Sequence, residues 1–283
     1  MTNHDPQHLS FSQAQGYEAL PQPLRLEELT REARVGIWNI LYEAVDYELR
    51  GFESHPLWTP LFRAVYADFL HLPLDSWEGT RSILTGEVRN IIIHGDFNWV
   101  FDLLTFILRD THCPYDLKLG MAVIFEKFQL AYSLDMSDPP TIYPVSTPEE
   151  GNALIQSLED LSERGLVGAR EHLRQAANCI SQEDWAGAIR ESIHAVESVA
   201  CQIAPGTKTL GEALKVLKQS GLLEHPALEQ GFDKIYGYTN DERGIRHALL
   251  DQSSADVGID EALFMFGACA SFASYLSRKQ SSV

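Results

Sequence analysis

The sequence predicts an all-α protein. Apolar residues recur every three to four positions through most of the 283 residues, as on the buried face of a helix, whereas the alternation typical of strands is almost absent. Prolines and glycines cut this pattern into segments of ordinary helix length. With 45% hydrophobic and 22% charged residues, the chain is typical globular material and is long enough for two domains.

Five helices are expected in the amino-terminal part, where Gly51, Pro73, Gly95 and Pro114 separate the helical segments. Tryptophan and phenylalanine recur within these segments, which is typical of helices that pack around a common core. The expected helices cover residues 26–49, 57–71, 79–94, 97–109 and 115–130.

A Pro-rich linker is expected over residues 135–147, where the helical pattern stops and prolines cluster. It separates an amino-terminal helical domain, residues 1–134, from a second helical domain, residues 148–283. Thr147 is expected to cap the first helix of the second domain, because Pro148 and then two acidic residues follow it.

The second domain is expected to be a four-helix core with a short helical insert. Gly165 or Gly168 is expected to break its first, long helical segment. Small residues in its last helix allow close helix packing, either with a second copy of the chain or inside one bundle. The expected helices cover residues 148–181, 184–203, 210–219, 227–236, a segment that starts near residue 240, and 259–278.

Two features mark the start of the helix near Asn240. Gly237 and the residues after it are expected to interrupt the preceding helix, and Thr239 with Glu242 has the spacing of a capping box. In such a box each side chain accepts a hydrogen bond from a free backbone N–H of the first turn. A helix is therefore predicted from Asn240 onward.

The predicted helix carries a cluster of phosphate-binding side chains. Arg243, Arg246 and His247 fall within about 100° of arc together with Leu250, while the other apolar residues lie on the opposite side. Two guanidiniums, an imidazole and the positive end of the helix can together hold a phosphodiester. The alternative is a solvated face whose arginines pair with Asp241 and Glu242.

Residues at the edge of an apolar stripe in the expected helix 184–203 can support this cluster. Glu191 or Glu197 can fix the orientation of Arg246 or His247, and Arg190 lies beside them. The alternative is a surface pair between Arg190 and Glu197 that contributes a few tenths of a kcal/mol.

The charge balance limits the kind of nucleic-acid binding that is possible. A net charge of −18 without any Lys/Arg-rich run argues against a protein that coats duplexes regardless of sequence. An enzyme needs only a few well-placed cations, so a local RNA site remains compatible with this balance.

No metal or other cofactor is expected. Cys113, Cys179, Cys201 and Cys269 are far apart in the sequence, and no His/Asp ligand spacing supports a metal-dependent hydrolase. The amino terminus lacks the pattern of a signal peptide, and the longest apolar run, residues 262–276, is short for a bilayer. A soluble cytoplasmic protein without membrane contact is expected.

Three stretches of the second half resemble a bacterial HEPN-type helical domain: residues 188–198, 236–248 and 264–276. The likeness is to the carboxy-terminal part of abortive-infection proteins that carry the fourth class of AbiJ amino-terminal domain. The opening of the chain resembles the start of that amino-terminal domain, at Phe11-Ser12, Gly16-Tyr17 and residues 34–41.

The resemblance implies a dimer whose two Arg/His motifs meet in one cleft and cut RNA without a metal ion. His247 would be the acid–base group, and Arg246 or Arg243 would stabilise the phosphate while the 2′-hydroxyl attacks. The sequence departs from the family pattern, because HEPN nucleases place more residues between arginine and histidine than the three between Arg243 and His247.

A rival site with the commoner HEPN spacing lies in the amino-terminal domain. There Arg89 is followed by the polar Asn90 and, after three isoleucines, by His94. In the AbiJ-type domain this segment would be a packing helix, which favours the motif of the second domain.

Two functions follow from these residues together with the resemblance. The first is a metal-independent endoribonuclease effector of anti-phage abortive infection, in which the first domain senses a phage-derived trigger or partner protein or restrains the second domain. The alternative is a non-catalytic HEPN-like module that binds a nucleotide or protein partner. Both predict a homodimer, and neither requires a cofactor.

Overall fold

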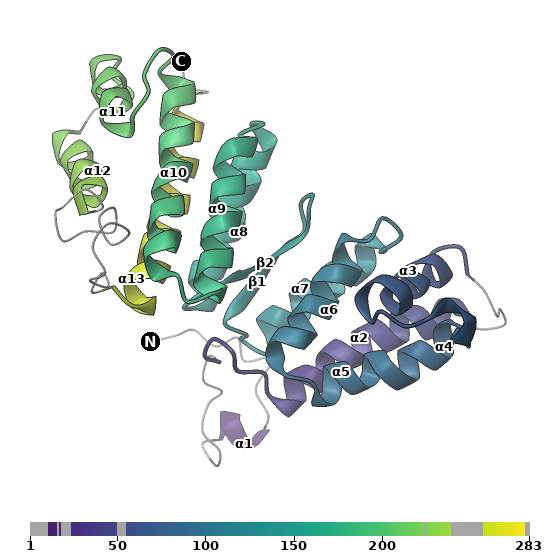
Figure 1. Ribbon diagram of the computed structural model, residues 1–283. Helices are drawn as coiled ribbons and strands as arrows, with labels where there is room; N and C mark the ends of the chain where they lie inside the picture. The colour runs from purple at the N-terminus through teal and green to yellow at the C-terminus, as the bar shows by residue number, and fades with distance from the viewer. Residues whose placement is uncertain are drawn as a thin grey trace, which may run out of the picture. The chain divides into compact units, whose positions relative to one another are not determined.

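A computed structural model describes residues 11–15, 17, 24–49, 55–223, 225–238 and 257–280 (Figure 1). The described residues are mostly helical, with one two-stranded sheet, so the expected all-α class is confirmed. Contacts divide the chain into two units, Met1–Ile142 and Tyr143–Val283. This division falls inside the segment that was expected to be a linker.

The first unit is a helical assembly around one hydrophobic core. Buried aliphatic and aromatic side chains from the helices and from the start of the sheet make up this core. Its helices are α1 (Phe11–Ala14), α2 (Arg31–Leu49), α3 (Trp58–Ala64), α4 (Thr80–Ile83), α5 (Arg89–His94), α6 (Phe97–Arg109) and α7 (Tyr115–Lys127).

Two of the helices expected here as regular contain a turn of π-helix. Val65–Phe69 continues α3, and Leu84–Val88 joins α4 to α5. A π-turn widens the repeat by one residue over a single turn, so apolar periodicity over a longer window does not show it. A short 3₁₀ turn, Leu74–Ser76, follows the first of them.

α2 begins at Arg31, later than the expected start at residue 26. The chain turns at Glu27, whose φ of 68° is incompatible with a continuing helix. Thr30 then caps α2, since its hydroxyl oxygen accepts a hydrogen bond from the backbone N–H of Ala33 at 3.3 Å.

The segment expected to be an irregular linker contains most of a short hairpin. β1 (Tyr132–Asp135) pairs with β2 (Thr141–Pro144). The buried carboxylate of Asp135 shapes the turn by accepting a hydrogen bond from the backbone N–H of Ser137 at 3.0 Å. The prolines mark the turn correctly, but strands of four residues are too short to produce a clear alternation.

The second unit consists of six described helices. Thr147 caps the first of them as expected, because its hydroxyl oxygen accepts a hydrogen bond from the N–H of Glu150 at 3.1 Å. Gly165, with a φ of 68°, ends that helix and confirms the expected break. The helices are α8 (Pro148–Glu163), α9 (Val167–Ser181), α10 (Trp185–Ile203), α11 (Leu210–Gln219), α12 (Pro226–Tyr238) and α13 (Ile259–Gln280).

Four of these helices pack together, and α13 is central among them. α13 contacts α8, α9 and α10, while α11 packs on α10 and α12 packs on α11 (Figure 1). A β-carbon at Gly267 would lie 2.6 Å from Glu150, and Ser274 contacts Asp160, so α13 runs in the same direction as α8. α11 and α12 therefore form a helical insert before the central helix.

α12 differs from the expectation at its end. It continues through Gly237 and ends at Tyr238, two residues later than expected but within the stretch that was expected to interrupt it. A glycine inside a helix costs only about 1 kcal/mol relative to alanine, which neighbouring residues readily offset. The expected cap at Thr239 and the expected helix from Asn240 lie outside the described residues.

Candidate functional site

The structure describes the residues on either side of the predicted Arg/His motif. Arg243, Arg246 and His247 lie outside the described residues. On one side α12 ends at Tyr238, and on the other the chain continues from Val257 into α13. The motif segment therefore connects the helical insert to the central helix of the second unit.

The predicted supporting residues lie on α10. The side chain of Asp184 caps this helix by accepting a hydrogen bond from the N–H of Gly187 at 2.8 Å. Its isoleucines and valines as far as Val199 are buried, which leaves Arg190, Glu191 and Glu197 half-buried at the border of the packed face.

Glu191 is held by a histidine that the sequence analysis did not single out. Its Oε2 lies 2.8 Å from Nδ1 of His172, which comes from α9. On its other side, Oε1 of Glu191 lies 3.8 Å from Nδ1 of His194, one helical turn further along α10. The carboxylate therefore lies between two imidazoles. We call these three residues the His172–Glu191–His194 cluster.

The two imidazoles of this cluster also contact each other. Their ring centroids are 5.4 Å apart, and the rings meet edge to face at 64°. The exposed fractions of the side chains are 35% for His172, 22% for Glu191 and 43% for His194, so solvent and small solutes reach all three.

Antiparallel packing of α9 and α10 brings the cluster together. Near one end of the pair a β-carbon at Gly168 would lie 2.9 Å from the hydroxyl of Ser198, and near the other end Cys179 contacts Asp184. The spacing of Glu191 and His194 was visible in the sequence. His172 was not predicted because pairing between helices leaves no local signal.

Several groups on α9 near His172 also have shifted pKa values. Hydrogen bonds from Arg174 and Gln175 lower the pKa of Glu171 to about 2. The hydrogen bond with Glu171 in turn raises the pKa of Arg174. Burial, together with the nearby Asp184 and Glu191 carboxylates, raises the pKa of the Cys179 thiol.

The cluster has two chemical capacities. A carboxylate that accepts a hydrogen bond from an imidazole fixes its tautomer and orientation, as in acid–base catalysis. Two imidazole nitrogens and a carboxylate oxygen are also a metal-ligand set. No spacing in the sequence indicates this ligand set, because His172 comes from a different helix than Glu191 and His194.

The rival residues on α5 are exposed and diverge. Arg89 and His94 are five positions apart, which turns their side chains about 140° away from each other on a helix. The guanidinium of Arg89 lies over the ring of Trp38, 5.9 Å from its centroid. Asn90 is exposed beside it. Within one protomer Arg89 and His94 therefore do not face one phosphate.

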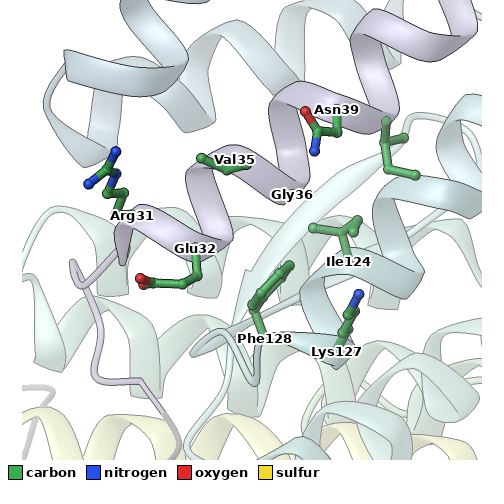
Figure 2. A pocket seen from close by; sticks show the side chains of 9 residues that line it. Arg31, Glu32, Val35, Gly36, Asn39, Ile124, Lys127 and Phe128 are labelled. Carbon is green, nitrogen blue, oxygen red and sulfur yellow. The ribbon is translucent and has the colours of Figure 1, made fainter. Parts of the chain in front are cut away.

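The first unit contains a hollow of about 480 Å³ between α2 and the end of α7 (Figure 2). The ring of Phe128 lies directly against α2, because a β-carbon at Gly36 would overlap Phe128 Cε2. Charged and apolar groups line the hollow together, which suits a small polar ligand. The lining residues are Arg31, Glu32, Val35, Gly36, Asn39, Ile40, Ile124, Lys127 and Phe128.

Comparison of the chain with protein-family models, curated proteins and solved structures gives no match. The AbiJ and HEPN resemblance therefore depends on the sequence stretches quoted above and stays a prediction.

α13 is the one described helix that is long and apolar enough to cross a membrane. More than half of that stretch is buried in the second unit, where it packs against α8, α9 and α10. Its place in the core of a helical bundle accounts for its apolar composition. The expected cytoplasmic location stays a prediction.

Proposed function

We propose that the second unit is a HEPN-like domain that cleaves RNA without a metal ion, with His247 as the acid–base group and Arg246 as the phosphate-binding group. The observation that carries the proposal is the order of the helices. Three helices and a helical insert precede the central helix α13, and the Arg/His motif lies in the segment between the insert and α13. Two of the three stretches that resemble a HEPN-type domain, residues 188–198 and 264–276, lie on α10 and α13, which pack against each other.

The proposed chemistry uses groups that are effective near neutral pH. An imidazole takes the proton of an RNA 2′-hydroxyl, and that oxygen attacks the adjacent phosphorus. A guanidinium stabilises the charge that develops on the phosphate, and the 5′-oxygen leaves with a proton. The products are a 2′,3′-cyclic phosphate and a 5′-hydroxyl end. Arg243, next to the pair, adds positive charge.

The geometry of α10 sharpens the proposed role of its acidic residues. Glu191 already accepts a hydrogen bond from His172, and a carboxylate has further lone pairs for a second partner. Glu197 lies two turns further along than Arg190 on the same half-buried border. Because His172 already occupies one oxygen of Glu191, we assign the orienting role toward Arg246 and His247 to Glu197 first, with Glu191 and Arg190 in support.

The proposed active form is a homodimer, since two motifs double the number of cations near one phosphate. Ala270, Ala273 and Ser274 are buried within the bundle, so they are not available to a second copy. The face of α13 that remains exposed carries Phe264, 64% exposed, and Ser271. We propose that this face contributes to the dimer contact.

The deciding experiment compares wild type with His247→Ala on total RNA in excess chelator. The expected result is new 2′,3′-cyclic ends with wild type and none with the variant. His94→Ala serves as the matched control, since it removes an exposed histidine from the rival site. Cleavage that stops in chelator while circular dichroism shows that the chain is still folded, or that survives in His247→Ala, would contradict the proposal.

A non-catalytic dimeric module that binds a nucleotide or protein partner is the alternative. In that case no RNA is cut under any condition, and Arg246→Ala weakens binding of the partner. In either case we propose that the first unit senses a phage-derived trigger or restrains the second unit. Its hollow beside α2 has a volume suited to a small ligand.

A further inference from the structure

We infer that His172, Glu191 and His194 bind one divalent transition-metal ion, with Zn²⁺ as the best fit. Each residue offers one ligand atom, and the three atoms lie within 4.8 Å of one another. Among the described residues this is the one group in which three such side chains meet. The inference goes beyond the proposed RNA chemistry and does not depend on it.

The ligand atoms select the type of ion. Zn²⁺ binds imidazole nitrogen at about 2.0–2.1 Å and carboxylate oxygen at about 2.0–2.2 Å, in tetrahedral geometry. Mg²⁺ and Ca²⁺ prefer sites made of oxygen atoms alone. Two imidazoles and one carboxylate leave the fourth position of a tetrahedral ion for a water molecule.

Small side-chain movements suffice to form this site. Ligand atoms of a tetrahedral zinc ion are about 3.3 Å apart, given the bond lengths of zinc sites. Distances between the ligand atoms, which are now up to 4.8 Å, therefore have to shorten by about 1.5 Å at most. All three side chains are partly exposed, so they have room to rotate, and an ion can reach them from solvent.

A histidine–carboxylate pair alone does not explain the cluster. His112 and Asp110 in the first unit form such a pair at 2.8 Å, but no third ligand joins them among the described residues. In the cluster, His172 already occupies one oxygen of Glu191. Nδ1 of His194 is 3.8 Å from the other, beyond hydrogen-bond distance. A shared metal ion gives the second imidazole a bonded partner.

The ion would join α9 to α10 where these antiparallel helices pack. His172 contributes from one helix and Glu191 with His194 from the other, so coordination fixes the distance between them. An ion that binds only the folded unit raises its stability by mass action. We therefore assign the ion a structural role, distinct from the acid–base and phosphate-binding roles of the Arg/His motif.

The test is a titration of the full chain, freed of metal, with Zn²⁺ in an isothermal calorimeter. The expected result is one ion per chain, with affinity lowered about tenfold or more in His172→Ala, His194→Ala and Glu191→Gln. His112→Ala and Cys179→Ser are the controls, and both should bind as wild type does. A second readout is the visible spectrum with Co²⁺, which should show the bands of a tetrahedral ion in wild type and lose them in His194→Ala.

His194→Ala is the decisive variant because its imidazole makes no hydrogen bond among the described residues, so the helices should fold without it. Circular dichroism checks this directly. Absence of Zn²⁺ binding in wild type, or unchanged affinity in both histidine variants, would overturn the inference. Metal binding together with chelator-resistant RNA cleavage would support both proposals, whereas metal binding without cleavage would leave only this one standing.

Discussion

The hydroxyl of Ser274 on α13 donates a hydrogen bond to the carboxylate of Asp160 on α8, with 2.5 Å between Oγ and Oδ2. Ser274 is fully buried, and Asp160 also pairs with Arg278 at 3.3 Å. This polar contact joins the central helix to α8. It fixes the position of α13 along α8, which apolar packing alone specifies less sharply.

Ser274→Ala is expected to destabilise the second unit by about 1–3 kcal/mol, since a partly buried carboxylate loses a charge-assisted hydrogen bond. Ser277→Ala is the matched control, because the Ser277 hydroxyl, equally buried, donates to a backbone carbonyl of its own helix. Urea unfolding followed by circular dichroism measures both variants. Equal losses for the two would show that the Asp160 contact has no special contribution.

Gly36→Ala is expected to destabilise the first unit by about 1–3 kcal/mol, since the new methyl group overlaps the ring of Phe128. Gly86→Ala is the control, because no atom lies within 4 Å of its added β-carbon, and alanine there should be neutral or stabilising. Tryptophan fluorescence during unfolding reports on this unit, which holds four of the five tryptophans. A stable Gly36→Ala would mean that Phe128 moves freely out of the hollow.

Two of the four cysteines are expected to resist alkylation in the folded protein. Burial raises the pKa of Cys269 to about 12 and that of Cys113 to about 11, which suppresses the reactive thiolate. Treatment with iodoacetamide at pH 8 followed by mass spectrometry should leave both unmodified until urea is added. Rapid labelling of Cys269 without denaturant would show that α13 leaves its packed position.

Acid is expected to weaken the second unit through Glu171. Its pKa is lowered to about 2, below the usual value of 4.5, so the folded state releases this proton more readily than the unfolded state. The stabilisation is therefore complete above about pH 5 and is lost as pH falls toward 2. Because the Glu171 and Arg174 side chains are 44% and 29% exposed, solvent limits it to about 1 kcal/mol at most.

Glu171→Gln tests this expectation. Unfolding in urea at pH 7 and at pH 3 should show a smaller loss of stability on acidification in the variant than in wild type. An identical pH dependence would place the acid sensitivity in other carboxylates.

The rival sites are separated by paired variants. Arg89→Ala with His94→Ala should leave RNA cleavage unchanged, because these side chains diverge by about 140° on α5. Arg246→Ala with His247→Ala should abolish it. Gel analysis of the RNA products measures both, and loss of cleavage in the first pair would move the active site to the first unit.

Local sequence signals predicted parts of the fold closely. α6 (Phe97–Arg109) and α11 (Leu210–Gln219) have the bounds expected from the sequence, and the cap at Thr147 forms as expected. In these places the information is short-range: a capping side chain or a proline fixes where the backbone can enter a helix.

Two kinds of feature were not visible in the sequence: short local irregularities and contacts between helices. The π-turns in the first unit and the short hairpin are local departures that periodicity averages out. The contact between His172 and Glu191 depends on how two helices align, and no spacing within either helix encodes it. The proposed roles of Arg246 and His247 rest on their sequence pattern, because both residues lie outside the part of the chain that the structure describes.

The central position of α13 has a consequence for synthesis. Because α8, α9 and α10 all pack against the helix that is translated after the Arg/His motif, a nascent chain that has not reached α13 lacks the element that completes its core. The motif is thus made before the bundle that would hold it can close. During synthesis the proposed RNA-cleaving residues would therefore be in an inactive arrangement until α13 has been translated.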